Sequence, residues 1–327
     1  MSKLQGHNEV ENFFQLVRFG KPDYIPSDIP GHQAAYLGSF HENFEGQSHN
    51  SEVGTIWTDV WGVTWKKEFE GVMGFPVEHP LADLTKLSSF AFPDLKDPKY
   101  TFRLYDEAKK ANGKILSGVN NNLIWEKAAF LVGMEDLMAY MYTEPQLVKE
   151  LFRRIMDFQL ELATHNVKAG CKIINMGDDL GTQNSLLLGM DLFNELIFPE
   201  YKRIFDFYRD HDIIINFHSC GYIEPMIETF IELGVNILNP IQSSANNLKN
   251  VRAMSKNRLV LQGAVNSDVV YSGTENEIRS LVRKRIDMLG KDGGYICCPD
   301  QGLDYPPENI EILEDEVRSY GKLYPAM

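Results

Sequence analysis

The sequence contains little cysteine, few basic clusters and no long apolar run. Only 4 of the 327 residues are cysteine, which is too sparse for a disulfide framework, so we expect a reducing compartment and a cytoplasmic location. The net charge of −14 without a Lys/Arg cluster argues against a nucleic-acid surface. No uncharged apolar stretch approaches the roughly 20 residues of a membrane span, and the polar residues 1–11 have no signal-peptide pattern.

Several motifs of cofactor binding and covalent catalysis are also absent. No Gly-x-Gly-x-x-Gly follows a predicted strand, which argues against a dinucleotide site. There is no phosphate-binding Walker loop and no Gly-x-Ser-x-Gly elbow. The Asp-x-His-x-x-Gly stretch of base-off cobalamin binding is missing as well. The chemistry of this chain must therefore be sought in other residues.

The sequence does contain a regular alternation of short apolar segments and helical patterns, which begins near residue 99. Hydrophobic residues make up 43% of the chain, a globular composition. Continuous apolar strands that alternate with helices are typical of a parallel sheet covered on both faces. The predicted strands are residues 24–29, 114–119, 172–176, 213–217, 237–241, 259–262 and 295–298, and the main predicted helices are residues 1–20, 99–112, 191–210, 223–233, 275–289 and 307–320, with further helices across 125–169 and a short one ending at 255.

The segments that follow most of these strands are polar or contain glycine. In a (β/α)8 barrel the functional residues lie at the C-terminal ends of the strands. We therefore predict an α/β fold, a (β/α)8 TIM-type barrel with an irregular N-terminal elaboration, whose eighth strand is atypical or hidden in the irregular region. A doubly wound open sheet is the competing fold. We expect a single domain over residues 1–327, with an extension and cap over 1–98, including a hairpin near 58–70, and a regular barrel over 99–327.

The strongest candidate site lies in residues 213–221, where a β-branched run leads into His218 and Cys220 and ends at Gly221. Side chains two positions apart on a strand point to the same side, so the imidazole and the thiol can converge. Imidazole and thiolate are ligands that zinc selects. For His-x-Cys alone, a satisfied core histidine beside a buried cysteine is an equally weighted alternative. The position at a strand end and the late cysteines favour the metal site.

A third ligand is expected from Cys297 or Cys298 on the last predicted strand, because the ends of distant strands meet at the mouth of a closed barrel. Catalytic zinc typically keeps three protein ligands and one open position. Only one of two adjacent thiols can point inward from a regular strand. Cys298 is nearer to the strand end and is slightly favoured, and the choice stays open. A core role for both cysteines is the alternative.

Three aspartates are candidates for catalysis or ligation. Asp178 and Asp179 directly follow a predicted buried strand, where they can complete a metal site, move a proton or contact a substrate. Asp179 can instead cap a following turn. Asp59 lies between Trp57 and Trp61, where a desolvated carboxylate can bind a cationic or hydroxylated substrate. An ordinary hairpin aspartate is an equal alternative for that position.

Distinctive segments occur in order along the whole chain and resemble those of one protein family. They are Arg18-Phe19-Gly20-Lys21-Pro22-Asp23-Tyr24-Ile25-Pro26, Asp59-Val60-Trp61-Gly62-Val63, Gly177-Asp178-Asp179-Leu180-Gly181, Phe217-His218-Ser219-Cys220-Gly221, Gly293-Gly294-Tyr295 and Pro306-Pro307-Glu308-Asn309-Ile310. Together they resemble the uroporphyrinogen decarboxylase superfamily, more closely its corrinoid-dependent methyltransferase branch. The resemblance implies a (β/α)8 barrel, a corrinoid protein as partner and, in some members, zinc held by His-x-Cys and a distant Cys.

The chain differs from known members of the superfamily at two places, and each difference limits the activities that the resemblance implies. True uroporphyrinogen decarboxylases hold the tetrapyrrole carboxylates with an arginine-rich N-terminal segment, whereas this chain has only Arg18 before Arg103. Without arginines such a substrate would lack electrostatic support, so we do not expect porphyrinogen decarboxylation. In thiol-methylating relatives a cysteine follows Pro-Gly after the last strand, and Gln301 stands at that place here. This favours members that take methyl from a donor and pass it to cobalamin.

The residues and the resemblance together predict a zinc-dependent methyltransferase. It would move a methyl group between a small donor, such as a methoxylated aromatic, and cobalamin carried by a separate corrinoid protein. Zinc on the histidine and cysteines named above would polarise the donor or acceptor heteroatom, and one of the adjacent aspartates would complete the coordination or protonate the leaving group. The alternatives are a thiol-methylating methylcobamide methyltransferase and a metal-independent decarboxylase with Asp59 as the acid. We expect no nucleic-acid or membrane partner, and a homodimer is compatible with the sequence.

Overall fold

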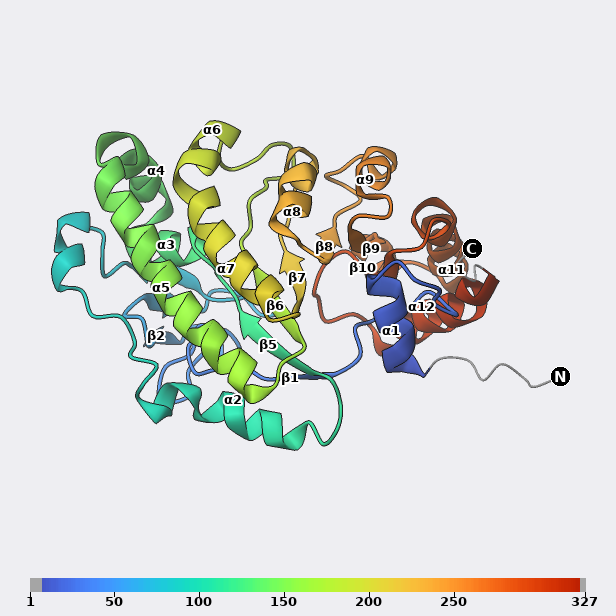
Figure 1. Ribbon diagram of the computed structural model, residues 1–327, viewed down its shortest axis with the longest axis horizontal. Helices are drawn as coiled ribbons and strands as arrows, with labels where there is room; N and C mark the ends of the chain where they lie inside the picture. Colours follow the sequence, from blue (N-terminus) through green and yellow to red (C-terminus); the bar gives the residue numbers. More distant parts are fainter. Residues whose placement is uncertain (1–7, 324–327) are drawn as a thin grey trace. The chain divides into compact units, whose positions relative to one another are not determined.

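The computed structural model describes residues 8–323 (Figure 1), which form two compact units. The first unit contains residues 8–31, 180–187 and 214–323, and the second contains residues 32–179 and 188–213. Each unit contains parallel strands joined by helices.

The second unit carries the parallel strands β1 (His32–Gln33), β5 (Leu116–Asn120) and β6 (Ile173–Gly177) in the order β1-β5-β6. Every residue of β5 is buried, as expected for a strand covered on both faces. Two long helices, α5 (Pro145–Ala169) and α7 (Phe198–Asp210), lie side by side (Figure 1). The other helical segments are η1 (Leu84–Ser89), α2 (Pro98–Lys110), α3 (Trp125–Val132), α4 (Met134–Thr143), α6 (Met190–Leu192) and η2 (Phe193–Ile197).

A separate antiparallel sheet lies in the second unit, within the predicted N-terminal extension. Strand β2 (Ile56–Thr58) pairs with β3 (Thr64–Lys66), and β3 pairs with β4 (Phe75–Glu78). Trp57 and Trp65 face each other across β2 and β3, and both are buried. The hairpin predicted near residues 58–70 is therefore confirmed, whereas the sequence did not predict β4.

The first unit begins with helix α1 (Glu9–Val17), which Asn8 caps. Glu11 N donates to Asn8 Oδ1, and Asn8 N donates to the Glu11 carboxylate, which forms a capping box. Phe13 and Leu16 are buried, so the predicted amphipathic helix is confirmed for the described residues. The remaining elements are β7 (Ile214–His218), η3 (Glu224–Met226), α8 (Ile227–Leu233), β8 (Ile237–Ile241), α9 (Leu248–Ser255), β9 (Val260–Val265), α10 (Ser267–Ser272), α11 (Glu275–Arg285), η4 (Ile286–Gly290), β10 (Tyr295–Pro299), α12 (Pro307–Tyr320) and η5 (Gly321–Leu323).

The parallel strands follow chain order throughout, β1-β5-β6-β7-β8-β9-β10. Parallel strands in chain order with helices between them are the topology of a (β/α)8-type barrel. The doubly wound alternative reverses its strand order partway, and no such reversal occurs in the described chain. The predicted barrel fold is confirmed.

The first strand of this topology is short and irregular. The predicted strand over 24–29 is wrong, because Pro26 lacks the N–H that a strand ladder needs and the segment forms bends without strand pairing. One contact of this segment remains strand-like, since Cys297 N on β10 donates to Pro26 O at 2.9 Å. The chain instead pairs at β1, where His32 N donates to Ile115 O at 2.7 Å. The expectation of an atypical strand in the irregular region is confirmed.

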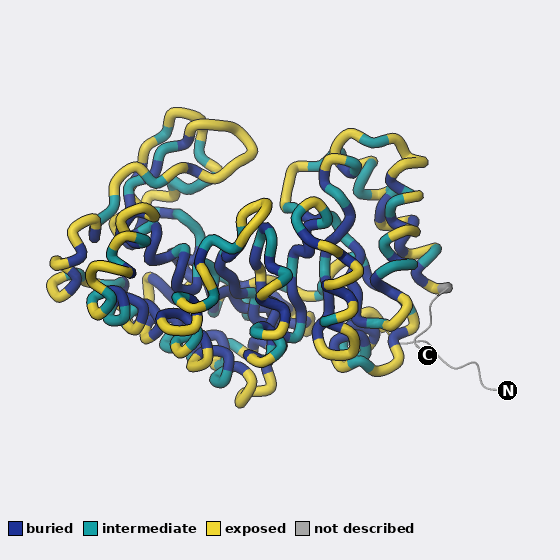
Figure 2. Tube along the Cα trace, turned by 90° about the horizontal axis from the view of Figure 1, so that it is seen from above, coloured by how far each residue is buried: buried dark blue, intermediate teal, exposed yellow. Residues whose placement is uncertain are grey.

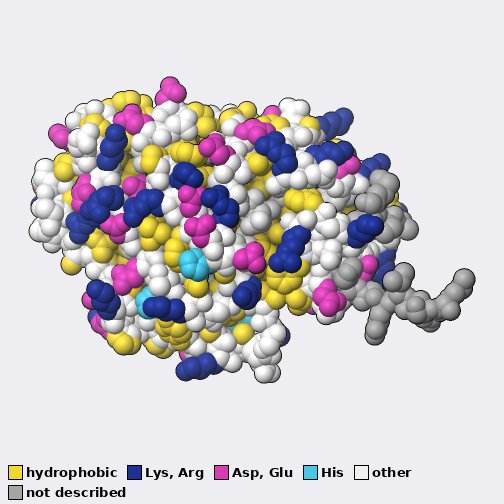
Figure 3. Space-filling model, viewed as in Figure 1, with side chains coloured by type: hydrophobic (Ala, Val, Ile, Leu, Met, Phe, Trp, Pro, Cys, Tyr) yellow, Lys and Arg dark blue, Asp and Glu magenta, His cyan; other side chains and the backbone are white. Residues whose placement is uncertain are grey.

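Buried residues form the interior of each unit, and exposed residues lie in loops and on outer helix faces (Figure 2). On the face seen in Figure 3, positive and negative side chains are interspersed and form no patch of one sign. Ion pairs between neighbouring helical turns include Arg153 with Asp157 on α5 and Lys202 with Asp206 on α7. No helix among the described residues is long and apolar enough to cross a membrane.

Candidate metal centre

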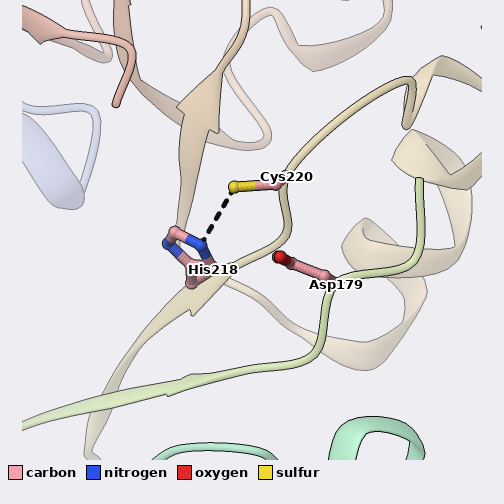
Figure 4. A group of neighbouring side chains, drawn as sticks. All are labelled: Asp179, His218 and Cys220. Atoms are coloured by element: carbon pink, nitrogen blue, oxygen red, sulfur yellow. Dashed lines mark hydrogen bonds between the residues drawn. The ribbon is translucent and has the colours of Figure 1, made fainter. Parts of the chain in front are cut away.

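Strand β7 ends in the two side chains that the sequence indicated. The strand is buried from Ile214 to Phe217, and His218 is its exposed last residue. Cys220 Sγ lies 3.3 Å from His218 Nε2 (Figure 4). The imidazole and the thiol therefore converge at the strand end, as the alternation of side chains along a strand predicts.

The loop after β6 packs against the loop after β7. Leu180 N donates to Ser219 Oγ at 3.1 Å, which ties the loop after β6 to the loop after β7. Gly221 has a φ of 83°, in the left-handed region that glycine tolerates. A Cβ at Gly221 would overlap the backbone of Gly181, so the close approach requires glycine there. These contacts fix the position of Asp179, which directly precedes Leu180.

Asp179 completes a group of three ligand-type side chains. A carboxylate oxygen of Asp179, a ring nitrogen of His218 and the sulfur of Cys220 all lie within 4.8 Å of one another. Figure 4 shows the Asp179 carboxylate directed toward the other two side chains. Nitrogen, sulfur and oxygen donors of these types are those found in zinc sites, and three protein ligands leave a fourth position for a substrate. The group is chemically suited to a catalytic metal.

Asn239 on β8 orients the histidine of this group. His218 Nδ1 lies 3.0 Å from Asn239 Oδ1, which can only accept, so Nδ1 carries the proton. Asn239 Nδ2 donates in turn to Asn216 Oδ1 at 2.6 Å. Nε2 is then the nitrogen that faces Cys220. This is the arrangement of a metal-ligating histidine whose second nitrogen is held by a neighbouring acceptor.

Asp178, the other predicted acid after β6, serves the fold. Its carboxylate is fully buried and accepts the backbone N–H groups of Ile124, Trp125 and Glu126 at 2.8, 2.9 and 3.1 Å. Tyr201 OH donates to the same carboxylate at 2.7 Å. Helix α3 has no cap from its own sequence neighbours, so Asp178 supplies the cap from β6. Burial raises the pKa of Asp178 to about 6, although these hydrogen bonds oppose the shift.

The two cysteines of β10 do not join the cluster formed by Asp179, His218 and Cys220. Among the described residues, that cluster is the one group of three or more such ligand atoms within 4.8 Å of one another. Cys297 is fully buried, whereas Cys298 is partly exposed. Burial raises the pKa of both thiols to about 12, so both are protonated at neutral pH in the metal-free chain. Ligation by Cys298 or Cys297 stays a prediction from the sequence.

Asp59 lies in the turn between β2 and β3, and its oxygens are used by that turn. Trp61 N and Val63 N donate to Oδ1 at 2.8 and 3.0 Å, and Trp65 Nε1 donates to Oδ2 at 2.9 Å. The carboxylate is buried, and burial raises its pKa. These contacts correspond to the structural alternative for Asp59.

Sequence reasoning missed three polar residues near the strand ends. Burial, followed by the negative charges of Asp179 and Asp178, raises the pKa of Glu126 well above its usual value. Lys127 is buried on α3, and Asn239 contacts His218. The first two read as ordinary polar positions of a helix, and Asn239 precedes Pro240 in the middle of an apolar strand. A search for polar residues inside predicted strands would have found Asn239.

Comparison with known proteins places the chain in a family. The profile of the family described as Uroporphyrinogen decarboxylase (URO-D) matches residues 75–320. A relative named uroporphyrinogen decarboxylase from Cupriavidus metallidurans is 26% identical over 269 residues, which cover 75% of this chain and 70% of the relative. Its namesake from Francisella philomiragia is 26% identical over 264 residues, covering 76% and 72% of the two chains.

A solved structure described as a methyltransferase from Methanosarcina mazei is also similar. It aligns over 95% of this chain and 98% of its own with a TM-score of 0.72, at 15% identity. At that identity the likeness concerns the fold, and function has to be argued from the site. The family profile, by contrast, spans more than half of the chain, from β4 to α12, and includes the loops that carry Asp179, His218 and Cys220. The protein is therefore a member of the uroporphyrinogen decarboxylase family.

Proposed function

We propose that this protein is a corrinoid-protein-dependent methyltransferase, which moves a methyl group between a small donor and the cobalamin of a partner protein. The observation that carries the proposal is the cluster of Asp179, His218 and Cys220 at the end of β7, with its ligand atoms within 4.8 Å of one another. The fold that the chain shares with the methyltransferase from Methanosarcina mazei supports the same assignment.

The cluster fits a zinc ion because its donor atoms are of the types that zinc binds and because its histidine is held in a suitable orientation. Asn239 holds the proton of His218 on Nδ1, which leaves Nε2 for the metal. When bound, zinc supplies a Lewis acid for the heteroatom that carries or receives the methyl group. Asp179, His218 and Cys220 would hold the ion, and the remaining coordination position would belong to the substrate.

The proposed reaction with a methoxylated aromatic donor balances as follows. The bond between oxygen and the methyl carbon breaks, and a bond between that carbon and cobalt forms. Both electrons of the new bond come from cobalt(I) of the partner, which becomes cobalt(III). The aryl oxygen keeps the electron pair of the broken bond and takes up a proton. The task of this chain is to hold the donor and to stabilise negative charge on the departing oxygen.

Two features favour the donor-demethylating direction over methylation of a thiol. Gln301 stands where the thiol-methylating relatives carry a cysteine. The third ligand atom in the cluster is an oxygen of Asp179. Replacing a thiolate by a carboxylate leaves less electron density on the metal, which suits withdrawal of charge from an ether oxygen. Thiol methylation remains the alternative within the same class.

The names of the curated relatives favour a second candidate, decarboxylation of a porphyrinogen. Arg18 precedes Arg103 without another arginine between them, and Arg103 is paired with Glu42 at 2.8 Å. Asp59, the expected acid of that reaction, already accepts three hydrogen bonds within its own turn. A substrate with several carboxylates would therefore find little cationic support in this segment.

The test is methyl transfer to free cob(I)alamin from 3-methoxybenzoate and, separately, from methylamine, followed by the loss of cob(I)alamin absorbance. The zinc-loaded protein should form methylcobalamin, and His218→Ala should lower the rate at least about 100-fold, because several kcal/mol of charge stabilisation are lost. His211→Ala is the matched control, since His211 is an exposed histidine at the end of α7.

Equal rates for the His218→Ala and His211→Ala variants would contradict the proposal. Release of carbon dioxide from uroporphyrinogen, at a rate unaffected by a zinc chelator, would establish the decarboxylase instead.

A further inference from the structure

Two lysines are buried in the second unit, and their ammonium groups differ in whether they have hydrogen-bond acceptors. Lys67 and Lys127 are each 3% exposed. Lys67 Nζ donates to His49 O at 2.7 Å and also to Val72 O, so its positive charge is held by backbone carbonyls. Lys67 is a buried lysine with a structural purpose, because it ties two loop segments together.

Lys127, on the first turn of α3, has no such partners. Its Nζ lies 4.3 Å from the centre of the Trp61 ring. Among residues 8–323, no hydrogen bond and no ion pair within 4.0 Å involves this ammonium group. A buried ammonium without an acceptor is costly, by several kcal/mol. Burial lowers the pKa of Lys127, and the negative charges of Asp59, Glu126 and Glu42 oppose that shift from a distance.

Two of the nearby carboxylates, those of Asp59 and Glu42, make hydrogen bonds to other groups. Asp59 accepts from Trp61 N, Val63 N and Trp65 Nε1. The buried Glu42 pairs with Arg103 through Oε1, whereas its Oε2 is buried without a hydrogen-bond partner among the described residues. Their negative charges oppose the lowering of the Lys127 pKa, but neither places an oxygen within hydrogen-bonding distance of Nζ. The ammonium therefore retains the capacity to bind an anion that the described chain does not provide.

His41 is a second nitrogen group in the same surroundings with unused hydrogen-bonding capacity. Its ring stacks on Trp65 with centroids 4.1 Å apart and meets the edge of Phe130 at 5.2 Å. Its Nε2 is buried and has no hydrogen-bond partner among the described residues. Burial, followed by the positive charge of Lys127, lowers the pKa of His41 to about 3, so the ring is neutral and can donate one proton.

The position of Lys127 in the fold connects it with the candidate site. Helix α3 follows the C-terminal end of β5, the side of the strands where barrel enzymes bind their substrates. The start of α3 is held by Asp178, the neighbour of Asp179. The same aspartate pair thus supplies a ligand to the cluster at β7 and fixes the helix that carries Lys127.

We propose that Lys127, assisted by His41, determines specificity by binding a carboxylate or phenolate oxygen of the methyl donor. This inference rests on the proposed methyltransferase function and adds the substrate class, an anionic aromatic methyl ether rather than a neutral one. A charge-assisted hydrogen bond from Lys127 Nζ to such an oxygen satisfies the ammonium that the fold leaves without an acceptor. Its loss corresponds to about 10- to 100-fold in affinity.

The test measures binding by calorimetry, without any corrinoid, so that it does not depend on methyl transfer. The probes are 3-methoxybenzoate and its neutral counterpart, methoxybenzene. The wild-type protein should bind the carboxylate at least about 10-fold more tightly than the neutral ether, and Lys127→Met should remove this preference. Binding of methoxybenzene should change less than about threefold. Lys67→Met, which removes the other buried ammonium, should keep the preference for the carboxylate.

The stability of the Lys127→Met variant gives a second readout. A lysine without a bonding partner should be replaced by methionine with no loss of stability, because an uncompensated buried charge is removed. A variant that fails to fold or melts well below the wild type would identify Lys127 as a structural counter-ion of Asp59 and overturn the proposal. A carboxylate preference that is absent in the wild type, or that survives in Lys127→Met, would also overturn it. Tight binding of 3-methoxybenzoate without methyl transfer would leave this inference standing and refute the proposed function.

Discussion

Two regions of the molecule place aspartates beside strand ends, and the fold uses them in different ways. Asp59 in the β2–β3 turn and Asp178, which follows β6 and caps α3, are buried, and each accepts at least three hydrogen bonds. Asp179 is partly exposed, and its carboxylate lies with His218 and Cys220 in one cluster of ligand atoms. A carboxylate whose oxygens are consumed by backbone N–H groups stabilises the fold, whereas one that faces an imidazole and a thiol can hold a metal.

The largest expected effect is on stability and separates Asp178 from its neighbour. Asp178→Ala should lower the free energy of unfolding by about 3–5 kcal/mol, because three backbone N–H groups and a buried tyrosine hydroxyl lose their acceptor. Asp179→Ala should cost less than about 1 kcal/mol, as expected for a partly exposed side chain. Urea unfolding of both variants checks this. Equal losses of stability in the two variants would show that the division between structural and ligand aspartates is wrong.

The next effect concerns the zinc affinity of the cluster, which should depend on the ligand Cys220 and on Asn239, the residue that orients His218. Cys220→Ser should weaken zinc binding by more than about 100-fold, since a ligand sulfur is removed, and Asn239→Ala by about 10- to 100-fold, since the histidine loses its orienting acceptor. Competition with a chromophoric chelator measures both affinities. Asp178→Asn is the control, because it keeps most of the cap and lies outside the cluster. An Asn239→Ala affinity equal to that of the wild type would remove Asn239 from the account.

A smaller effect concerns the pH dependence of the unfolding free energy, to which the buried His41 in the second unit should contribute differently from an exposed histidine. The pKa of His41 is lowered from 6.5 to about 3 by burial, so between these values the unfolded chain binds a proton that the folded chain does not. Stability contributed by the neutral ring is present above pH 6.5 and is lost as the pH falls toward 3. His41→Phe should flatten the pH dependence of the unfolding free energy by up to about 1.4 kcal/mol per pH unit in this window. His211→Phe is the matched exposed control, and an equal flattening in both variants would contradict the assignment.

The smallest expected effect concerns the cysteines of β10. If Asp179, His218 and Cys220 form the ligand set, Cys298→Ala should change the zinc affinity less than about threefold. A loss as large as that of Cys220→Ser would show instead that Cys298 supplies a ligand, as the sequence predicts. Chelator competition on the same protein preparations compares the two directly.

The sequence was sufficient for the features that depend on local periodicity. The strands β5 to β10 and the helix α12 follow from apolar runs and helical spacing, and the convergence of His218 and Cys220 follows from the alternation of a strand. The resemblance of the segments around these residues to one family also predicted the barrel before its strand order was known. These predictions required no knowledge of distant contacts.

What the sequence could not give depends on contacts between distant segments. Asp178 caps a helix that starts more than 50 residues earlier in the chain, and nothing local distinguishes it from Asp179. The first strand is β1 and not the predicted segment 24–29, which contains a proline. The pairing of β1 with Leu116, far along the chain, could not be seen in the local sequence. Lys127 reads as a solvated helix residue until its burial against Trp61 is seen. In each case the role of the residue is decided by a group from a distant part of the chain that lies against it. The local sequence pattern does not show which group that is.

The central claim is that Asp179, His218 and Cys220 hold a zinc ion, and X-ray absorption at the zinc edge tests it most directly. The zinc-loaded protein should show one sulfur at about 2.3 Å and nitrogen or oxygen neighbours at about 2.0–2.2 Å. In Cys220→Ser the sulfur should disappear while the lighter neighbours remain. A coordination shell without sulfur in the wild type, or a sulfur that persists in Cys220→Ser, would contradict the account.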